Sequence, residues 1–465
     1  MSSFFDKYIN AVENTETIKY TGFVTEVKGL LIESSGPRSV VGEICSIKIP
    51  STESQVLAEV IGFSGKTVKL MAYGETKGIE SGCEVVASGH TLEVPVGPSL
   101  LGRVINSVGK ACDGKEEIVP ETFYPAINSA PDPMSKKPIE LQMQTGVRAI
   151  DALLSVGRGQ RIGFFAGSGI GKSTIVSMIA RNAKADVNVI ALIGERGREV
   201  REFIENDLGE EGLKRSVVVQ STGDESAISQ LRAAYVATAV AEYFRDQGKD
   251  VMLMMDNVTR FAYAQRLIGL SNGEPPAQSG YPPSVFDAIP KLLERSGTND
   301  KGSITAFYAV LVDGDDLNEP ISDKVRGTLD GHIVLSRKLQ EQQHYPAIDV
   351  LKSISRLASH INGSATKKAV VKMKKWLSDY SSQEDMINAG VYQSGQNPAI
   401  DEAIKMHQAM EDFLCQDKAE ASTLRQTFLR MSELTGIEIP EEELTAMCGE
   451  EENVSSVLQN EHADE

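Results

Sequence analysis

The sequence predicts an α/β protein with an N-terminal β-barrel, a central parallel β-sheet with flanking helices, and a helical C-terminal domain. Three observations support this prediction. Short β-type runs fill residues 21–96, apolar runs alternate with helical patterns over residues 140–360, and a helical pattern prevails after about residue 365. Closely spaced short strands are typical of a barrel or sandwich, and strand–helix alternation is typical of a parallel sheet.

The composition fits a multi-domain globular protein. The 465 residues correspond to about three domains at roughly 150 residues each. Charged residues make up 24%, near the ~25% of ordinary globular proteins, so most of the chain is not disordered. The 47 basic and 65 acidic residues leave a net charge of −18, which argues against a surface built mainly for nucleic acid or anionic lipid.

Cysteines, histidines and apolar runs give no support for a disulfide framework, a zinc site or a membrane span. The five cysteines are scattered without a CxxC pair, the six histidines are dispersed, and no run of about 18 apolar residues occurs. The N-terminus lacks the basic region and apolar core of a secretory signal. We therefore expect a cytoplasmic protein.

The first residues carry a helical stripe. Within residues 3–14, apolar side chains recur at short helical intervals at Phe4, Phe5, Tyr8, Ile9 and Val12. Such a stripe fits a short helix packed on its own domain, and it also fits an exposed helix that binds a partner. We assign residues 1–18 to a partner-binding helix, because the stripe is terminal and contains two adjacent Phe.

Residues 19–96 form the predicted β-barrel. Its strand candidates are separated by Gly, Ser and Lys, and they read FVTEV, SVVGEICSIKI, VLAEVIGF, TVKLMAYG, EVVAS and TLEVPV. The second domain is placed at residues 97–364. A Pro-rich polar stretch over residues 126–138 predicts a linker within it.

The second domain contains five runs that are almost continuously apolar, as expected of parallel strands buried on both faces. The helical pattern over residues 226–247 places apolar side chains on one face and precedes Gly248, a typical residue after a helix end. The five strand candidates lie at 161–166, 187–194, 216–222, 250–256 and 303–312.

The last domain, residues 365–440, is predicted to be helical. Glutamates accumulate beyond it and no Lys or Arg follows Arg430, so residues 441–465 are predicted to be a solvated acidic tail. One helical face of this domain is marked by the 3-4-3 spacing of Ala403, Met406, Met410 and Phe413.

The clearest functional motif is AGSGIGKST, which follows an apolar strand and opens a helix. It fits the phosphate-binding loop pattern, except that Ala166 replaces the first Gly, and a small residue there still permits the turn. The glycines let successive N–H groups point at phosphates, and the helix start adds partial positive charge. The expected nucleotide-binding residues are Ala166, Gly167, Ser168, Gly169, Ile170, Gly171, Lys172, Ser173 and Thr174.

Lys172 and Ser173 carry the chemistry of this loop. The ammonium group of Lys172 neutralises β- and γ-phosphate oxygens, and the hydroxyl group of Ser173 binds Mg²⁺. The alternative is an accidental Gly-rich turn, and the GKS triplet at the correct place argues against it. The sequence therefore predicts a site for a nucleotide with Mg²⁺.

Three further residues suggest that the nucleotide is hydrolysed. Asp256 ends an apolar strand, where a carboxylate holds the Mg²⁺ water shell or, alternatively, caps the next turn. Glu195, followed by Arg196, ends another buried strand, where a carboxylate polarises the attacking water or forms a salt bridge. Arg356 lies beyond the last core strand. It belongs to a surface ion pair, or it stabilises transition-state charge, an effect of about 10³–10⁵ in rate.

Several long strings occur in the order that one protein family shows, over about residues 20–435. They resemble the catalytic ATPase of the bacterial flagellar and type III export apparatus, a family that is itself similar to subunits of F- and V-type rotary ATPases. The resemblance implies a RecA-like P-loop core, ATP as the nucleotide and Mg²⁺ as the cofactor. RFAYAQRLIGLSNGEPPAQSGYPPSVF is more similar to the flagellar than to the virulence-secretion branch. The strings are GVRAIDALLSVGRGQRIGFFAGSGIGKST, ALIGERGREV, AEYFRDQGKDVMLMMDNVTRFAYAQR, GEPPAQSGYPPSVFDAIPKLLERSG, GSITAFY and LDGHIVLSRKLQEQQHYPAID.

The resemblance also implies roles for individual residues. Glu195 matches the carboxylate that activates water, and Arg196 and Glu199 match positions around Mg²⁺ and the γ-phosphate. Asp256 matches the ligand of Mg²⁺-bound water, and Arg260 matches a nearby organising arginine.

Two residues later in the chain are also matched. Tyr345, in HYPAID, resembles the aromatic side chain on which adenine stacks. Arg356, in SISR, resembles the arginine that reaches into the neighbouring subunit's site, which favours this role over a surface ion pair. Asn257 departs from the family, whose members often have Ser there, although Asn also hydrogen-bonds locally. The presence of Glu195 separates the chain from non-catalytic rotary subunits.

An arginine supplied by a neighbour implies a ring, and the resemblance implies a homohexamer with the barrels as a collar. It also implies a peripheral stalk-like regulator on the N-terminal helix and a coiled-coil protein in the central channel. Export chaperone–substrate complexes and the membrane export gate are further expected partners. The assembly would dock at the cytoplasmic face of the inner membrane, and no nucleic-acid partner is expected.

Three alternatives stay open. A virulence type III secretion ATPase is the alternative within the same class. A hexameric nucleic-acid translocase shares the barrel and the core, but its barrel should carry aromatic platforms among Lys and Arg, and this barrel has few aromatics (Phe23, Phe63 and Tyr73). A non-catalytic ring subunit that only holds nucleotide is the third.

Overall fold

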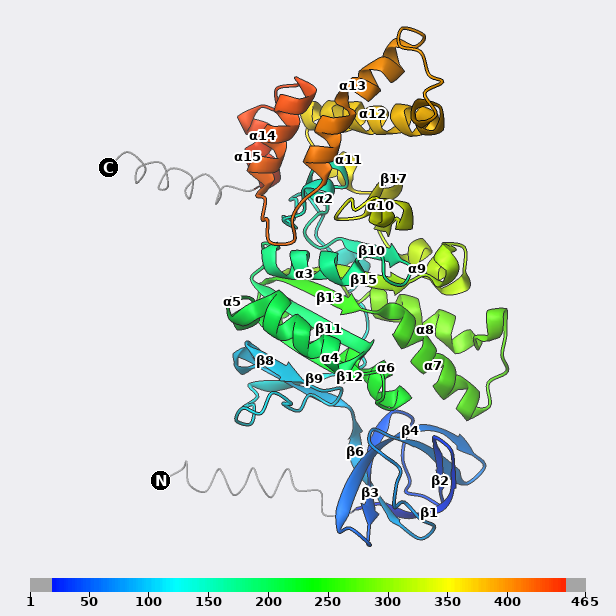
Figure 1. Cartoon of the computed structure of the whole chain (residues 1–465). Helices are drawn as coiled ribbons and strands as arrows, with labels where there is room; N and C mark the ends of the chain where they lie inside the picture. Colours follow the sequence, from blue (N-terminus) through cyan, green and yellow to red (C-terminus); the bar gives the residue numbers. More distant parts are fainter. Residues whose placement is uncertain (1–18, 449–465) are drawn as a thin grey trace, which may run out of the picture.

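The computed structural model describes residues 19–448, which form three parts stacked along one long axis (Figure 1). A β-barrel (blue) lies at one end, a large β-sheet with its helices lies in the middle, and the C-terminal helices (yellow to red) lie at the other end. This arrangement confirms the predicted fold class. The helix predicted for residues 1–18 lies outside the described residues.

Six antiparallel strands close the barrel in the order β1-β2-β5-β4-β3-β6. Val60 lies opposite Leu70, and Ile47 lies opposite Val85, and all four side chains are fully buried. Because side chains alternate between the two faces of a strand, these pairs fill the barrel interior. The strands are β1 (Thr21–Lys28), β2 (Leu31–Ser34), β3 (Glu43–Ile49), β4 (Ser54–Ser64), β5 (Thr67–Ala72) and β6 (Glu84–Thr91).

The barrel differs from its prediction in two details. The run TLEVPV is not a barrel strand, because β7 (Glu93–Val96) pairs with β9 (Thr122–Pro125) in a separate two-stranded sheet. Its two valines are buried in the core of the middle part, under helix α6 (Ala227–Asp246). The sequence also does not predict β2, whose four residues are too few for a clear alternation.

The middle part is built on a nine-stranded sheet with the order β17-β16-β10-β15-β13-β11-β12-β8, and β14 pairs with β15 beside this path. The five strands predicted from apolar runs are all present and run parallel to one another. The strands are β8 (Arg103–Ile105), β10 (Arg161–Ala166), β11 (Val187–Glu195), β12 (Ser216–Thr222), β13 (Asp250–Asp256), β14 (Gly297–Thr298), β15 (Ser303–Leu311), β16 (Gly331–Leu335) and β17 (Ile348–Ser355).

The sheet is not parallel throughout. β17 runs antiparallel to β16, so that Ser355 lies opposite Gly331, and the short β14 runs antiparallel to β15. Because β17 runs backwards, its last residue lies at the amino ends of β16 and β10. Residue 356 therefore emerges at the edge of the sheet that is opposite to the carboxyl ends of the parallel strands.

Helices cover both faces of the sheet and create two apolar cores. α6, α7 (Val258–Asn272) and α8 (Pro283–Leu293) pack on one face. α2 (Arg148–Leu153) and α3 (Lys172–Asn182) belong to the other core, which continues into the C-terminal helices. The connections contain α4 (Gly197–Glu202), the π-helix η3 (Phe203–Leu208), α5 (Gly209–Lys214), α9 (Pro320–Thr328), α10 (Arg337–Glu341), α11 (Ala358–Ile361) and the 3-10 turns η1 (Pro98–Leu100), η2 (Pro133–Ser135), η4 (Gln278–Gly280) and η5 (Asp313–Asp315).

The prediction for α6 is confirmed at both ends. The side chain of Ser226 accepts a hydrogen bond from the backbone N–H of Ser229, which caps the start of the helix. Gly248 follows the last turn with a φ of 80°, the left-handed conformation that glycine adopts without strain.

The C-terminal part is helical, as predicted, and its described residues form four helices. The expected stripe lies on the second of them, where Ala403, Met410 and Phe413 are buried and Met406 is partly buried against the core. None of the helices within residues 19–448 has both the length and the apolar character that crossing a membrane requires. The helices are α12 (Ser364–Asn388), α13 (Pro398–Leu414), α14 (Leu424–Thr435) and α15 (Glu441–Cys448).

The first part of the predicted acidic tail is folded. Residues 441–448 form α15, in which Leu444 and Met447, three residues apart, are buried on one face. Glu443 accepts hydrogen bonds from the backbone N–H groups of Ala365 and Thr366 at the start of α12. These apolar and capping contacts explain why α15 packs on the domain in spite of its charge. Residues 449–465 lie outside the described part of the chain.

Candidate active site

The phosphate-binding loop joins the carboxyl end of β10 to the start of α3. Ala166 is the last residue of β10, and its carbonyl oxygen accepts a hydrogen bond from the N–H of Val312 (2.9 Å). Its φ is not positive, so the Ala in place of the first Gly of the motif causes no strain. The substitution is therefore compatible with the loop, as the sequence predicts.

The geometry of the loop requires a glycine at 171 and favours one at 167. Gly171 immediately precedes α3 with a φ of 92°, in the left-handed region. A Cβ atom at Gly167 would lie 1.9 Å from Oδ1 of Asp315 and 3.0 Å from Nη2 of Arg337, and these two side chains form an ion pair beside the loop. A side chain at Gly167 would therefore displace that pair.

Lys172 lies between the two carboxylates that the sequence predicts. Its Nζ forms ion pairs with Oδ1 of Asp256 and with Oε1 of Glu195, the latter at 3.3 Å. β10, β11 and β13 are parallel, so their carboxyl ends bring the loop, Glu195 and Asp256 to one edge of the sheet. This is the edge at which open α/β sheets bind ligands.

Burial and charge set the pKa values at this edge in opposite ways. Burial raises the pKa of Asp256, the charge of Glu195 raises it further, and Lys172 only partly offsets the two effects. Burial alone would lower the pKa of Lys172, but the charges and hydrogen bonds of Asp256 and Glu195 outweigh it, so the pKa of Lys172 is raised. The lysine is therefore held as a cation at the place where phosphate oxygens are expected.

A cavity of about 120 Å³ is lined by the two carboxylates, Glu195 and Asp256, and by Ser173 of the loop. Hard cations such as Mg²⁺ bind oxygen ligands, and the hydroxyl of Ser173 and the carboxylates of Glu195 and Asp256 supply them. The donor set therefore fits Mg²⁺. The polar residues that line the cavity are Ser173, Glu195, Glu199, Glu202, Asp207 and Asp256.

Asn257 is a further residue of the site, and the sequence does not predict its role. Its Oδ1 accepts a hydrogen bond from the backbone N–H of Arg260 (2.9 Å), which caps α7. Its Nδ2 donates to Oε1 of Glu195 (3.0 Å). Because the cap occupies the oxygen, the nitrogen has to face Glu195, so this buried amide fixes both the helix start and the carboxylate.

Two expected arginines lie beside the site rather than in its acidic cavity. The side chain of Arg196 is 81% exposed and pairs with Glu199 (3.1 Å). Arg260 packs on Gly194, where a Cβ atom would lie 2.6 Å from its Cγ. Both arginines line a neighbouring cavity of about 560 Å³, so the roles expected for them stay predictions.

Tyr345 lies over the end of the phosphate-binding loop. A Cβ atom at Gly171 would be 3.7 Å from the Tyr345 ring, so the half-buried ring is next to the start of α3. The stacking on adenine that is expected of this ring stays a prediction.

The segment that carries Tyr345 is attached to the C-terminal part. The backbone N–H of Gln416 donates to the carbonyl oxygen of Tyr345 (2.8 Å). The adjacent His344 donates from Nδ1 to Oε2 of Glu411 on α13 (2.7 Å). The loop that carries His344 and Tyr345 is therefore connected directly to the C-terminal part.

Arg356 lies far from the loop of its own chain. Its backbone N–H donates to the carbonyl oxygen of Asp330 (3.0 Å), which lies beside Arg161, the first residue of β10. The loop begins after the last residue of that strand, five steps of about 3.3 Å away, or about 17 Å. The side chain is exposed, and no carboxylate among residues 19–448 pairs with its guanidinium group. The alternative of a surface ion pair is therefore not observed in this part of the chain.

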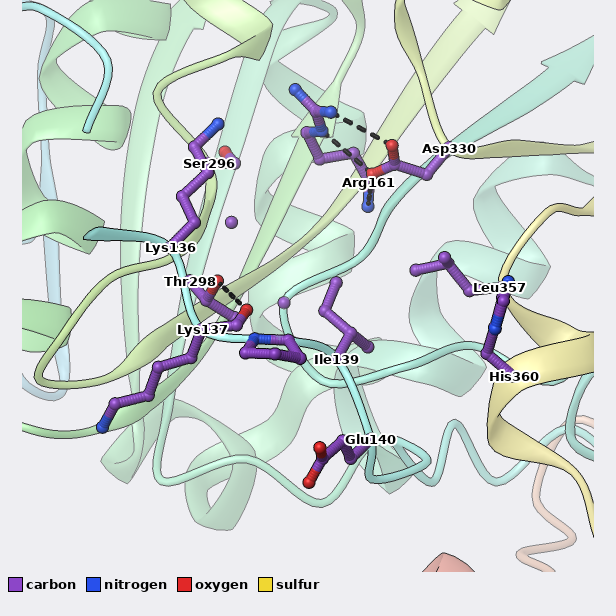
Figure 2. A pocket seen from close by; sticks show the side chains of 13 residues that line it. Lys136, Lys137, Ile139, Glu140, Arg161, Ser296, Thr298, Asp330, Leu357 and His360 are labelled. Atoms are coloured by element: carbon purple, nitrogen blue, oxygen red, sulfur yellow. Dashed lines mark hydrogen bonds and ion pairs between the residues drawn. The ribbon is translucent and has the colours of Figure 1, made fainter. Parts of the chain in front are cut away.

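A third cavity, of about 590 Å³, marks this opposite edge of the sheet (Figure 2). Leu357 and His360, just after Arg356, lie on one side of it, and Lys136 and Lys137 of the predicted linker lie on the other. The Arg161–Asp330 pair closes its upper side in the view of Figure 2. The cavity is separated from the phosphate-binding loop by the length of β10.

Fold and site together define a P-loop ATPase with an N-terminal barrel and a helical C-terminal domain. Three family models match the chain. Residues 146–355 match the nucleotide-binding domain of the ATP synthase alpha/beta family, and residues 24–89 match the beta-barrel domain of the same family. Residues 363–433 match the T3SS EscN ATPase C-terminal domain.

Curated relatives agree over almost the whole chain. The flagellum-specific ATP synthase of Treponema pallidum is 56% identical over 433 residues, which cover 93% of this chain and 97% of the relative. The flagellum-specific ATP synthase of Bacillus subtilis is 52% identical, over 92% of this chain and 98% of the relative. The type 3 secretion system ATPase of Xanthomonas euvesicatoria is 47% identical over 414 residues, covering 89% and 94%.

Solved structures show the same architecture. The assembled ATPase EscN of the enteropathogenic E. coli type III secretion system has a TM-score of 0.85 and 42% identity, covering 89% of this chain and all of that one. EscN in complex with its central stalk EscO has a TM-score of 0.83 and 41% identity, with the same coverage of both chains. The chain belongs to the ATP synthase alpha/beta family, and within it to the flagellar and type III secretion ATPases. It is an ATP-hydrolysing enzyme, and the export class is favoured over a nucleic-acid translocase.

Proposed function

We propose that this chain hydrolyses ATP at the subunit interfaces of a homohexameric ring and that hydrolysis energises flagellar protein export. The observation that carries this proposal is the position of Arg356 at the edge of the sheet opposite to its own phosphate-binding loop. An exposed arginine without a carboxylate partner in the described chain is available to a neighbouring copy. An arginine that enters an active site from a neighbour stabilises the charge of phosphoryl transfer.

Within one copy, we assign a separate step of nucleotide binding or hydrolysis to each residue of the site. Lys172 exchanges its present carboxylate partners for β- and γ-phosphate oxygens, and Tyr345 stacks on adenine. Ser173 and Asp256 hold Mg²⁺, which neutralises phosphate charge when bound. Glu195, held by Asn257, accepts a proton from the attacking water. The remaining loop residues, together with Arg196, Glu199 and Arg260, are assigned to nucleotide binding or to its surroundings.

The flagellar branch is supported by the relatives. The flagellum-specific enzymes of T. pallidum and B. subtilis are 56% and 52% identical to this chain, against 47% for the type 3 secretion ATPase of X. euvesicatoria. A virulence secretion ATPase is the second candidate, because the C-terminal family model and the similar solved structures come from that branch.

The proposed partners follow from the family. The complex of EscN with its central stalk EscO supports a coiled-coil partner in the centre of the ring. We assign a peripheral stalk-like regulator to residues 1–18, and chaperone–substrate complexes and the membrane export gate to the rest of the assembly. The ring would work in the cytoplasm, docked at the cytoplasmic face of the inner membrane.

Mixing two inactive variants tests the shared site. Lys172→Ala removes the loop cation and leaves Arg356, whereas Arg356→Ala leaves the loop intact. Mixed before assembly, the two should recover ATPase activity at interfaces that combine an intact loop with an intact arginine. A mixture as inactive as its components would contradict a site shared between copies. Specific activity should also fall on dilution, together with the loss of rings seen by light scattering.

A further inference from the structure

Asp330, in the turn before β16, forms an ion pair with Arg161, the first residue of β10. Asp330 accepts hydrogen bonds from the guanidinium group of Arg161 in a two-pronged arrangement, from Nε to Oδ2 and from Nη2 to Oδ1, both at 3.0 Å (Figure 2). Oδ2 also accepts from the backbone N–H of Arg161 (3.1 Å). Such a pair fixes the orientation of both side chains more strictly than a single hydrogen bond does.

The backbone of Asp330 in turn binds the backbone of Arg356 in the same chain. Its carbonyl oxygen accepts the N–H of Arg356 (3.0 Å) and the side-chain amide of Gln160 (3.3 Å). The same amide nitrogen donates to Oγ of Ser355 (3.1 Å), and that hydroxyl donates to the carbonyl oxygen of Ser155 (2.8 Å). The main chain at residues 355 and 356 is therefore tied to β10 and to the segment before it.

Arg161 is itself anchored from a second side. Its Nη1 pairs with Oε1 of Glu294 (2.6 Å), and Lys136 pairs with the other oxygen of the same carboxylate (3.3 Å). Burial alone would lower the pKa of Arg161, but Asp330 and Glu294 outweigh it and raise that pKa. The guanidinium group is thus a mostly buried cation that is held between two carboxylates, those of Asp330 and Glu294.

The strand between the two sites is short and is paired on both sides within the sheet. β10 begins with Arg161 and ends with Ala166, where the phosphate-binding loop starts, and it lies in the middle of the sheet between β15 and β16. The carboxyl end of this strand therefore leads into the chain's own phosphate-binding loop. Its amino end lies next to Arg356, the arginine that we assign to the neighbouring copy's site.

We propose that the Arg161–Asp330 pair positions Arg356 for the active site of the neighbouring copy. The pair acts through the backbone of residue 356 and touches no nucleotide, so both of its members are positioning residues. This inference rests on the proposed function, since it needs a neighbour's site for Arg356 to enter.

Asp330→Asn is the first test, because it keeps the shape of the side chain and removes the negative charge that pairs with Arg161. A misplacement of about 1 Å in a catalytic group costs on the order of 10²-fold in rate. We therefore expect kcat to fall at least about tenfold, with the KM for ATP nearly unchanged. Asp323→Asn is the matched control, because it breaks an exposed Arg326–Asp323 pair on the preceding helix α9, and it should keep wild-type kinetics.

Two mixtures decide where the defect acts. Asp330→Asn mixed with Lys172→Ala should recover activity, because Lys172→Ala copies supply a well-placed Arg356. Asp330→Asn mixed with Arg356→Ala should not rise above the residual activity of Asp330→Asn alone, because no copy in that mixture supplies a well-placed Arg356. The opposite pattern would place the defect in the variant's own phosphate-binding loop and would overturn the proposal, as would wild-type kcat in Asp330→Asn.

Two further measurements keep this test decisive. Circular dichroism and thermal unfolding establish that Asp330→Asn is folded, and if it is not, Arg161→Lys takes its place, since it keeps the cation and loses the two-pronged geometry. Arg161→Lys should show the same rescue by Lys172→Ala and the same lack of rescue by Arg356→Ala. The mixture of Arg356→Ala with Lys172→Ala is run alongside. If that mixture fails, the shared site itself is wrong, which is distinct from a failure of Asp330→Asn alone.

Discussion

Lys172 and Arg356 lie at opposite ends of strand β10: the lysine follows the loop at its carboxyl end, and the arginine is hydrogen-bonded next to its amino end. The two residues therefore cannot meet on the same nucleotide within one copy, since about 17 Å of strand separates their attachment points. Both are expected to act on the terminal phosphate of ATP. If both residues act on that phosphate, as proposed, the chemistry requires an assembly of several copies.

Glu195→Gln should abolish turnover and preserve nucleotide binding. The amide keeps the shape of the side chain and its hydrogen bonds, but it cannot take a proton from water, so kcat should fall about 10²–10⁴-fold. A fluorescent ATP analogue would measure binding, and phosphate release would measure turnover. Glu205→Gln, which breaks an exposed pair with Arg201, is the control and should behave as wild type. Unchanged turnover in Glu195→Gln would remove this carboxylate from the mechanism.

Loss of the Asn257 side-chain N–H donor alone should lower kcat and change the stability of the fold little. Asn257→Ser keeps a capping oxygen for α7 and loses the hydrogen bond to Glu195, so kcat should fall about tenfold with little change in unfolding. Asn257→Ala loses both contacts and should in addition be less stable by about 1 kcal/mol. Steady-state kinetics with thermal unfolding separates the two effects. Wild-type kcat in the Ser variant would show that Glu195 needs no such support.

Tyr345 should contribute to the binding of the base. Tyr345→Ala removes the ring beside the loop and should raise the KM for ATP roughly tenfold, since stacking on a base contributes about 1–3 kcal/mol. Tyr345→Phe keeps the ring and should stay within about twofold of wild type. Titration with ATP and with inorganic triphosphate distinguishes loss of base binding from loss of phosphate binding. Equal weakening of both ligands would argue against stacking.

The contact between His344 and Glu411 should stabilise the protein in a pH-dependent way. The hydrogen bond from His344 lowers the pKa of Glu411. A lowered carboxyl pKa stabilises the fold above the ordinary value of about 4.3, and the stabilisation is lost as the pH falls through the lowered value. Because Glu411 is about one-third exposed, its loss should cost only about 1 kcal/mol at neutral pH. Urea unfolding of wild type and Glu411→Gln from pH 7 to pH 3 should show this difference disappear in acid, and a difference constant with pH would contradict it.

Glu242 and Arg295 form the most buried ion pair of the middle part, with each side chain 1% exposed. Arg295 donates to both oxygens of Glu242 and to the carbonyl oxygen of Ala126. Glu242→Gln leaves the arginine without a countercharge, so it should destabilise the fold by about 3–5 kcal/mol. Calorimetry would measure this against Glu211→Gln, whose exposed pair with Lys214 should contribute nothing measurable.

Much of the catalytic edge could be predicted from sequence, because its signals are local. The motif around Lys172 is continuous, and Glu195 and Asp256 each end an apolar run, so the parallel-strand rule alone brings them together. The roles of Asn257 and Asp330 could not be predicted in this way. The partner of Asn257 lies 62 residues away and that of Asp330 169 residues away, and nothing local indicates which distant side chains they meet.

The errors in the fold have the same origin. The run containing Val94 and Val96 alternates like a barrel strand, and only its packing under α6 shows that it belongs elsewhere. The glutamates of residues 441–448 indicate a solvated tail, and the buried Leu444 and Met447 outweigh that signal. In both cases tertiary contacts decide between two local readings of the same residues.

The most direct test is a structure of the assembled chain with Mg²⁺, ADP and an aluminium fluoride that mimics the transferring phosphoryl group. We expect each occupied site to lie between two copies, with Glu195 of one copy facing the attacking water and Arg356 of the neighbouring copy within hydrogen-bond distance of the fluoride. An assembly in which Arg356 points away from every bound nucleotide would contradict this account.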